Sequence, residues 1–384
     1  MLIYLLNALS MPLYGKKIKN RAVLSVVATT QMFLILALRS VKLGVDMPSY
    51  AGAYKYIGRY TFEKLLPKLS LIKSVHLTKK YVLESGYVIL NWCSSKLGLD
   101  FRTFMIAVAF VTMLGFGYFI YRYSKIPWMS FFLFSTLGMY SYCFGILRQS
   151  LAISILLFTV PLLEKKKWLP ALPLFFAAFE IHRVSLIFAF LIPFALFDVP
   201  LKKKHFKKGF VLIGWFIALS PVIYKAVVVT ALRILGKTSY LAVKFQWNKL
   251  IVLMLLVLAA VVILCDFSLF KGKFESMMLW AFVLAILVEI IGMSNDVIAR
   301  AVEVFYIFVI VLIPYVLYTL PEELVISLPG NTALEVNGKA LAKWATVALV
   351  IMLTLFLAYS VKGAHLYPYK SFNYDRLVAA FGKN

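Results

Sequence analysis

The sequence predicts an all-α, polytopic membrane protein, and three observations support this fold class. Hydrophobic residues form 62% of the 384 residues and the mean hydropathy is +0.89, whereas soluble domains average about 45–50% apolar residues. The apolar residues gather in long runs, and basic residues gather in the segments between them. Since lipid-exposed backbone must form its own hydrogen bonds, the runs are expected to be helices.

The apolar runs predict a single transmembrane domain over residues 1–384, with roughly 11–12 spans that include short or broken ones. They lie near residues 1–14, 22–38, 101–121, 128–144, 147–163, 168–181, 184–198, 209–229, 249–265, 277–293, 300–319 and 343–360. The first run carries its basic residues after it, which favours a span with an outside N-terminus over a cleaved signal peptide. The runs at 168–181 and 184–198 are shorter than the roughly 20 residues of a straight span, so we expect broken or tilted helices that meet inside the membrane.

The charge distribution predicts which side of the membrane each loop faces. Net charge is +25, from 41 Lys and Arg against 16 Asp and Glu. In a soluble protein this excess would indicate nucleic acid, but between membrane spans it indicates anionic lipid and topology, so no nucleic-acid partner is expected. Four alternate loops carry the basic clusters of the side that we interpret as cytoplasmic: Lys16–Lys19, Arg122 with Lys125, Lys165–Lys167, and Lys202–Lys204 with Lys207 and Lys208.

The opposite, extracytoplasmic side is predicted to hold a long loop and most of the arginines. The loop at 39–100 is expected to carry interfacial helices, one of them around Val88–Trp92. Eight of the ten arginines fall on this side: Arg39, Arg59, Arg102, Arg148, Arg183, Arg233, Arg300 and Arg376. Because a guanidinium can hold phosphate through two parallel hydrogen bonds, this distribution points to an anion-binding outer face.

Two polar groups at the ends of spans are candidates for function. Arg148 and Gln149 begin a predicted span, where a charge is costly and marks a functional residue; the alternative is an arginine that extends to the outer headgroups. His182 stands between two short apolar runs, with Glu180 and Arg183 beside it. A lone membrane histidine is often only a packing residue, but three ionisable residues in four positions favour a function.

Further candidates lie in the outer segments. Gly44, Asp46 and Pro48 predict a turn that brings Asp46 back toward Arg39, although Arg39 could also be an interfacial anchor. Glu84 precedes the amphipathic stretch of the long loop. On a helix, Asp296, Arg300 and Glu303 would share one face, and a structural ion pair explains that spacing as well as a function does.

Several classes of chemistry lack their motifs in this sequence. It has no phosphate-binding P-loop and no dinucleotide-binding glycine pattern. It also lacks the Cys and His clusters of zinc or haem sites and the paired-Asp loop of calcium sites. The three cysteines, Cys93, Cys143 and Cys265, have neither metal nor disulfide spacing. ATP-driven transport and redox chemistry are therefore disfavoured, and we expect no metal and no cofactor.

A series of short motifs, taken in chain order, makes the sequence similar to a known family. They are Ala37–Ser40 with Gly44, Asp46 and Tyr50; Glu84–Tyr87; Leu147–Ala152; His182–Ser185; and Arg300 with Tyr306, followed by Tyr367–Lys370. In this arrangement the sequence resembles the EpsG family of exopolysaccharide proteins over essentially its whole length. One departure is Gly44-Val45-Asp46, where the family usually has Gly-Thr-Asp.

The resemblance implies a Wzy-like polysaccharide polymerase with a GT-C-like fold, embedded in the bacterial inner membrane with its active site facing outward. Such enzymes, as in O-antigen synthesis, transfer glycan from a polyprenyl-diphosphate-linked oligosaccharide to a sugar hydroxyl of another lipid-linked repeat unit. Besides membrane lipid, the implied partners are a chain-length regulator and a flippase. This picture agrees with an arginine-rich outer face beside lipid.

On this mechanism each candidate residue receives a predicted role. Negative charge grows on the diphosphate as the glycosidic bond breaks, and preorganised cations would stabilise it without a metal. The predicted diphosphate-binding residues are Arg39, Arg148, Arg300 and Arg183. The predicted catalytic residues are His182, because imidazole titrates near neutral pH, and Asp46 as the other candidate base. The predicted sugar-binding residues are Glu84, Tyr50, Tyr87 and Asp296.

Three other functions stay open at this stage. A flippase or transporter of the lipid-linked sugar would need polar groups along a path, and the inner halves of the spans hold almost no charge. An O-antigen-type ligase shares the chemistry and differs only in its acceptor. A non-catalytic assembly partner should tolerate alanine at Arg148, whereas an enzyme that uses this arginine should not.

Overall fold

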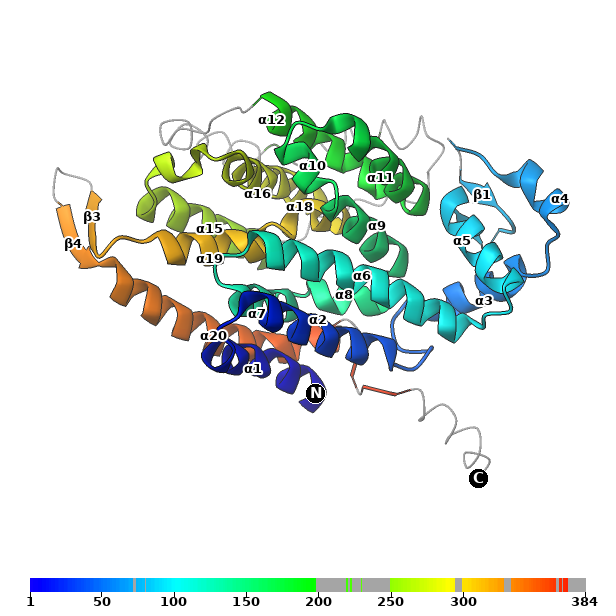
Figure 1. Ribbon diagram of the computed structural model, residues 1–384, viewed down its shortest axis with the longest axis horizontal. Helices are drawn as coiled ribbons and strands as arrows, with labels where there is room; N and C mark the ends of the chain where they lie inside the picture. Colours follow the sequence, from blue (N-terminus) through cyan, green and yellow to red (C-terminus); the bar gives the residue numbers. More distant parts are fainter. Residues whose placement is uncertain are drawn as a thin grey trace. The chain divides into compact units, whose positions relative to one another are not determined.

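The computed structural model describes residues 1–71, 74–79, 81–197, 249–293, 299–327, 333–363, 366–367 and 369–371, together with three isolated positions, 219, 222 and 229 (Figure 1). The chain packs into two compact units. Met1–Leu186 and Ala348–Asn384 form the first unit, and Ile187–Val347 forms the second. Both contain apolar helices, and the prediction of one transmembrane domain stays a prediction.

The first unit is a bundle of long apolar helices. α1 (Leu2–Lys17) packs against α7 (Pro127–Thr136), and α2 (Arg21–Ala37) packs against α6 (Phe101–Tyr123), which also contacts α9 (Leu147–Leu157). A Cβ atom at Gly117 would collide with Thr29 of α2, and one at Gly115 with Ser154 of α9. These glycines therefore let α6 approach both neighbours closely, as small residues do between membrane helices.

Two predicted spans of the first unit are each interrupted. The run at 128–144 forms α7 and α8 (Met139–Gly145), separated at Gly138, whose φ of +95° is easy only for glycine. The run at 147–163 forms α9 and α10 (Val160–Glu164). Ile146, with φ −100° and ψ 63°, separates α8 from α9. Residues 147–149 therefore begin a new helix.

The third interruption lies at His182 and was predicted. α11 (Trp168–Ile181) ends there, because His182 has extended backbone angles, φ −156° and ψ 118°. A 3₁₀ helix, η2 (Arg183–Leu191), follows and leads to α12 (Ile192–Phe197). The expectation of two short helical pieces meeting at a polar residue is confirmed.

The long loop of the first unit folds into a small subdomain at one end of α6 (Figure 1). Gly44 has a φ of +118°, so the predicted turn is present and leads into the first helix of the loop. The loop's elements are α3 (Met47–Ile57), α4 (Phe62–Leu65), η1 (Leu66–Lys68), the antiparallel pair β1 (Val75–His76) and β2 (Val82–Leu83), and α5 (Ser85–Lys96). The predicted helix around Val88–Trp92 is part of α5.

The second unit contains further apolar helices and an unpredicted hairpin. Its helices after α12 are α15 (Lys249–Leu264), η5 (Phe267–Lys271), α16 (Lys273–Gly292), η6 (Arg300–Val302), α18 (Glu303–Tyr306) and α19 (Val309–Thr319). β3 (Glu323–Ser327) pairs antiparallel with β4 (Ala333–Asn337), with Glu323 opposite Asn337. The hairpin lies between the predicted spans at 300–319 and 343–360. α20 (Gly338–Gly363) begins in the second unit and ends in the first.

Five helical segments in the described part of the chain are long and apolar enough to cross a membrane. They are Phe101–Tyr123, Leu147–Glu164, Lys273–Gly292, Arg300–Thr319 and Gly338–Leu357. Shorter apolar helices coincide with the predicted runs at 22–38, 168–181, 184–198 and 249–265. The all-α, polytopic membrane class is thus confirmed, while the predicted span at 209–229 lies outside the described residues apart from single positions.

Candidate functional site

Glu84 is the centre of a polar cluster in the first unit. It immediately precedes α5, but its carboxylate does not cap that helix and is only 6% exposed. Its Oε2 forms an ion pair with Arg148 Nη1 of α9. Its Oε1 lies 3.2 Å from His182 Nδ1 and 3.4 Å from the backbone N–H of Arg183. One carboxylate from the loop subdomain therefore joins the start of α9 to the end of α11.

Two tyrosine rings support Arg148 from the loop subdomain. The guanidinium carbon lies 5.7 Å from the ring centroids of both Tyr50 (α3) and Tyr87 (α5). The two rings meet edge to face at 5.9 Å. Tyr50 is 5% exposed and Tyr87 is fully buried, so their faces are covered by protein in this structure. Their predicted stacking on sugars stays a prediction, and it would require these rings to be uncovered.

His182 is held at the break after α11 with one ring edge fixed. Its backbone N–H donates to the Ala178 carbonyl at 2.9 Å, and the Ser185 hydroxyl donates to the His182 carbonyl. With Glu84 ionised, the His182 Nδ1 carries the proton that faces the carboxylate, and Nε2 is left as the accepting nitrogen. The His182 side chain is 19% exposed, so it is not fully enclosed by protein.

The pKa of Glu84 reflects this cluster. Burial alone would raise the pKa of the carboxyl, because the charged form loses water. The hydrogen bond with His182 and the positive charge of Arg148 outweigh burial and lower the pKa of Glu84 to about 2. Glu84 is therefore a carboxylate at neutral pH, which suits it to orient His182 and to balance Arg148 but not to donate a proton.

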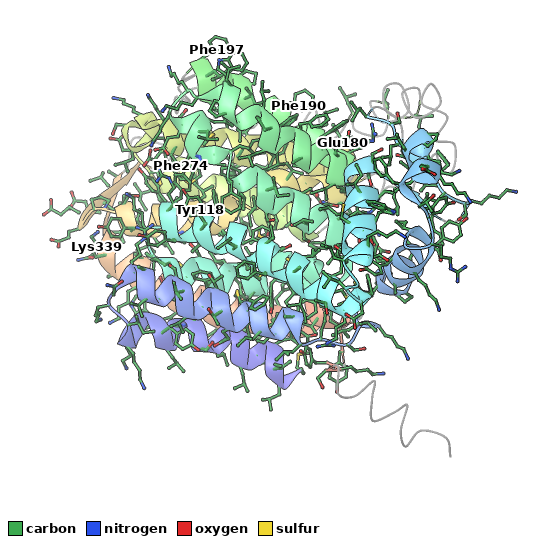
Figure 2. All side chains as sticks on the ribbon, turned by 45° about the vertical axis from the view of Figure 1, so that its right-hand side comes forward. Tyr118, Glu180, Phe190, Phe197, Phe274 and Lys339 are labelled. Carbon is green, nitrogen blue, oxygen red and sulfur yellow. The ribbon has the colours of Figure 1, made fainter. Side chains whose placement is uncertain are left out.

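A close approach of α5 and α11 brings the cluster together. A Cβ atom at Gly86 would collide with the backbone and side chain of Glu180, which Figure 2 labels at the end of α11. The Arg183 guanidinium lies 4.9 Å from the Phe179 ring and interacts electrostatically with Glu180. Arg183 thus reaches Glu84 through its backbone N–H, while its side chain lies against α11. Its predicted role toward diphosphate stays a prediction.

Arg39 and Asp46 lie where the chain enters the loop subdomain. Arg39 is 1% exposed, and its Nη1 donates to the Cys143 carbonyl at 3.0 Å. Asp46 precedes α3 and acts electrostatically on Tyr50. Asp46 thus stands close to the ring that supports Arg148, whereas the guanidinium of Arg39 is enclosed. Their predicted roles, as a base and as a diphosphate ligand, stay predictions.

The remaining predicted site residues belong to the second unit. Arg300 is exposed at the start of η6, and Glu303 follows it as a buried residue. Asp296 lies outside the described residues, so the predicted shared face of Asp296, Arg300 and Glu303 is not tested. The roles predicted for Arg300 and Asp296 stay predictions.

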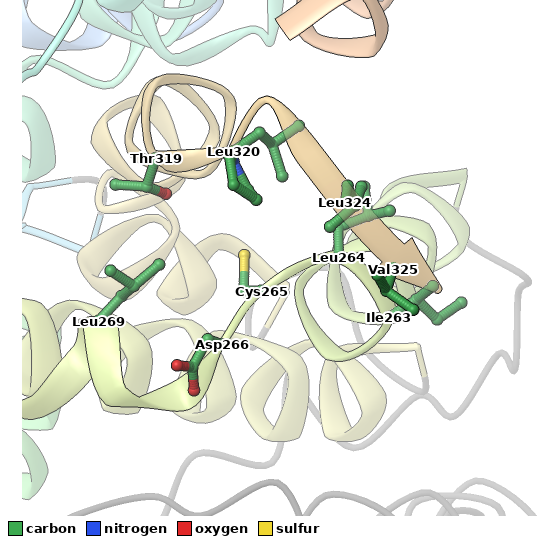
Figure 3. Close-up of a pocket in the computed structure, with 10 residues that line it drawn as sticks. Ile263, Leu264, Cys265, Asp266, Leu269, Thr319, Leu320, Leu324 and Val325 are labelled. Carbon is green, nitrogen blue, oxygen red and sulfur yellow. The ribbon is translucent and has the colours of Figure 1, made fainter. Parts of the chain in front are cut away.

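A cavity of about 500 Å³ in the second unit offers different chemistry (Figure 3). It is lined by Ile263, Leu264, Cys265, Asp266, Leu269, Thr319, Leu320, Pro321, Leu324 and Val325. Both oxygens of Asp266 are engaged by Ser268, through its backbone N–H at 2.9 Å and its hydroxyl. None of the lining residues is Lys or Arg, so the cavity does not resemble the anion-binding site that the sequence predicts. Across the described ranges, no group of three His, Cys, Asp or Glu residues could hold a metal ion.

The comparison with family models assigns the chain to a family. Residues 22–329 match the model of the EpsG family. The chain belongs to the EpsG family. This membership associates it with polymerase-like membrane proteins of exopolysaccharide synthesis, as the sequence motifs implied. No curated protein matches the chain, and no solved structure matches it. The motif at Tyr367–Lys370 lies beyond the matched residues.

The structure shows contacts of two residues, Glu84 and Gly86, that the sequence did not predict. Glu84 was assigned to sugar binding, but its carboxylate links Arg148 to His182. Gly86 received no role, although it permits the approach of α5 to α11. In the sequence, Gly86 directly follows Glu84-Ser85. A glycine inside a helix can mark a close contact with a neighbouring helix, because a side chain would not fit there.

Proposed function

We propose that this EpsG-family protein polymerises lipid-linked oligosaccharide repeat units at the outer face of the bacterial inner membrane. The observation that carries the proposal is the cluster in which one ionised carboxylate, Glu84, contacts both Arg148 and His182. An arginine for a departing diphosphate and an oriented imidazole for an attacking hydroxyl are the two groups that this transfer needs.

Arg148 would serve the departing polyprenyl diphosphate. As the bond between the anomeric carbon and the diphosphate oxygen breaks, the electron pair stays on that oxygen, and negative charge grows there. A guanidinium already in place binds this charge more tightly than the ground state, which lowers the barrier. The Arg148 side chain is 19% exposed, and a guanidinium has more N–H donors than its ion pair with Glu84 uses, which supports a role toward phosphate oxygens.

His182 would accept the proton of the attacking sugar hydroxyl. The hydroxyl oxygen forms the new bond to the anomeric carbon, and its proton moves to His182 Nε2. The contact with Glu84 holds Nδ1–H and stabilises the imidazolium that forms, the role of the acidic residue in a catalytic triad. The proton then leaves to water or to the released diphosphate, so that charge and protons balance over one cycle.

Sidedness and further roles complete the proposal. The basic loops favour an extracytoplasmic position for the start of α9 and the end of α11, which supports assembly of the polymer at the outer face of the membrane. Asp46 is proposed as a second acceptor of hydroxyl protons near Tyr50, and Asp296, Tyr50 and Tyr87 as sugar contacts. Arg183 and Arg300 are proposed as further cations for the diphosphate. The proposed partners are the lipid-linked oligosaccharide, a flippase and a chain-length regulator.

Reconstitution tests the proposal directly. The purified protein in liposomes, supplied with polyprenyl-diphosphate-linked repeat units, should yield glycans of several repeats on lipid and release polyprenyl diphosphate in equal number to the bonds formed. Deletion of the gene should leave single repeat units on lipid. Transfer to a different acceptor without chain growth would indicate a ligase, and translocation without release of diphosphate would indicate a flippase; either result would reject the polymerase.

A further inference from the structure

Arg39 is a fully enclosed cation at the end of α2. Its Nη1 donates to the Cys143 carbonyl at 3.0 Å, its Nη2 lies 3.6 Å from the Met47 sulfur, and its guanidinium carbon is 5.3 Å from the centroid of the Phe144 ring. Within the described part of the chain, no carboxylate forms an ion pair with it. A buried cation without a paired anion destabilises the fold, so the contacts that hold Arg39 in place need an explanation.

The neighbours of Arg39 are the last residues of α8. The final carbonyls of a helix lack partners within the helix, and Arg39 supplies one to Cys143. The turn at Gly44 lies against the same helix end, since a Cβ there would meet the Phe144 carbonyl and the Gly145 Cα. Only a glycine with positive φ fits at this position. The chain that leaves α2 is thus fastened to α8 at two points.

The C-terminal segment covers the same point from the other side. The Ser40 N–H donates to the Lys370 carbonyl at 2.7 Å, and Arg39 pairs with Ser371 in an isolated antiparallel bridge. The Tyr369 hydroxyl donates to the Ile35 carbonyl at 2.9 Å, and the Tyr4 hydroxyl donates to the Leu366 carbonyl at 3.0 Å. All of these residues belong to the first unit. Tyr369 and Ile35 are 334 residues apart in the sequence. A segment from the far end of the chain therefore packs against the backbone on either side of Arg39.

We propose that Arg39 is a positioning residue that fixes the break between α8 and α9, and that Leu366 and Tyr369–Ser371 form the clasp that keeps it there. Arg148 follows Cys143 by five positions, with the non-helical Ile146 between them. Gly145 at the end of α8 permits a break before Ile146 but does not by itself fix the direction of the next helix, so the held end of α8 sets where α9 begins. The catalytic meaning of this inference rests on the function proposed above, whereas the clasp itself does not.

The geometry explains why an arginine is used. Its planar fork reaches a carbonyl and a sulfur at once while its face lies over an aromatic ring, and lysine cannot make these three contacts together. This differs from the diphosphate-binding role predicted from sequence, because a ligand would have to displace the Cys143 carbonyl and the C-terminal segment before it reached the guanidinium.

Two native cysteines allow a test of the clasp without any activity assay. Cys143 lies beside Arg39 and is 1% exposed, and Cys265 of the second unit is 4% exposed. In a Cys93→Ser background, which removes the exposed thiol, N-ethylmaleimide should leave both protected. Arg39→Lys should raise the labelling rate of Cys143 several-fold and leave Cys265 protected. A chain ending after residue 365 should give the same pattern, and Arg122→Lys, a matched change elsewhere in the unit, should not.

Two other labelling patterns would reject the clasp. Continued protection of Cys143 in both the Arg39→Lys and the truncated protein would reject the clasp. Labelling of both cysteines would show that Arg39 supports the whole fold and not this break, which also rejects it. Only selective labelling of Cys143 in both variants supports it.

A polymerisation assay then separates positioning from direct binding of diphosphate. If Arg39 acts through Arg148, the Arg39→Lys/Arg148→Lys double variant should polymerise no more slowly than Arg148→Lys alone, and Arg39→Lys should lower kcat with little change in KM. Multiplying losses would show an independent diphosphate ligand and overturn the positioning role. If the wild-type protein does not polymerise at all, the proposed function fails while the labelling result still stands.

Discussion

Two arginine–glutamate ion pairs in the described part of the first unit share their chemistry but differ in burial and in the groups that they contact. Arg148 and Glu84 are largely buried, contact two tyrosines, and share the carboxylate with His182. Arg122 and Glu164 are 3.3 Å apart, with side chains 35% and 28% exposed, and contact Tyr123. Arg148 is the second residue of α9 and Glu164 the last of α10, so about 24 Å separates them along the helical segment Leu147–Glu164 at 1.5 Å per residue.

The difference shows what makes an ion pair a candidate site. The exposed pair joins the ends of two helices and contributes about 0–1 kcal/mol, as surface pairs do. The buried pair shares its carboxylate with an imidazole, which brings a candidate base to the cation, whereas the exposed pair shares its carboxylate with the Tyr123 hydroxyl. Each pair can therefore serve as the matched control for the other.

The test of membrane orientation should give the largest effect, because a topology reporter is either active or nearly inactive. A periplasmic reporter fused after Asn20 should be inactive, and one fused after Lys79 should be active, since the basic loop near Lys16–Lys19 stays inside. This would place the buried pair outside and the exposed pair inside. The reverse pattern of reporter activity would overturn the outer site altogether.

Substitution of the two arginines should separate the pairs by function. Arg148→Ala should reduce polymerisation by about 10²–10³-fold, the cost of losing one donor to a developing anion. Arg148→Lys should reach the membrane and still polymerise poorly, because it loses the two-pronged hydrogen bonding, whereas Arg122→Lys should behave as wild type. The measurement is chain length of the glycan normalised to protein in the membrane; wild-type chains in Arg148→Lys would make Arg148 structural.

Substitutions of Glu84 and His182 should have non-additive effects on kcat. His182→Ala should lower kcat by about 10²-fold, the lower end for general base catalysis. Glu84→Gln should also lower kcat, and the double variant should be little worse than His182→Ala, since Glu84 acts through the ring it orients. Glu164→Gln is the matched control and should leave kcat unchanged. Independent, multiplying losses would mean that Glu84 also acts apart from His182, through Arg148 or by contact with substrate.

The pH dependence of Tm should report the ionised state of Glu84, with a smaller effect than the substitutions have on activity. Because the folded state lowers the pKa of Glu84 from 4.5 to about 2, the ionised carboxylate stabilises the fold at and above pH 4.5, and this contribution is lost as the pH falls toward 2. Wild type should therefore exceed Glu84→Gln in Tm at pH 7, and the difference should shrink between about pH 4.5 and 2. A difference that stays constant down to pH 2 would contradict an ion-paired Glu84.

Removal of divalent metal should have the smallest effect. Polymerisation by the purified protein should survive EDTA, because arginines can supply the counter-charge of the diphosphate. Loss of activity that magnesium restores would point to carboxylates around Asp46 and Asp296 and would displace Arg148 as the main counter-charge.

Much of the architecture followed from apolar runs and polar interruptions. The helices at Arg21–Ala37, Phe101–Tyr123 and Lys273–Gly292 lie close to the predicted spans, because each run is long enough to need the bilayer. The break at His182 was visible since a polar residue stood between two short runs. The break at Gly138 was not, because an apolar run continues through it and only the backbone angle of the glycine reveals it.

The site was predictable as a set of residues but not as a set of contacts. Arg148 and His182 stood out because ionisable groups at span ends are costly. Their link through Glu84 depends on how the loop subdomain folds back, over 64 residues to one partner and 98 to the other, and no local pattern encodes that. The enclosure of Arg39 was hidden for the same reason, since Leu366 and Tyr369–Ser371 lie at the far end of the chain.

The interruption at Ile146 has a consequence for electrostatics that does not depend on any side chain. Because α8 stops there and α9 starts afresh, the first amide groups of α9 begin at the position of Arg148 rather than continuing a longer helix. The aligned peptide dipoles of α9 put the equivalent of about half a positive charge at that end. Part of the positive potential at this point is thus supplied by the backbone, and it would persist in every variant that keeps the break.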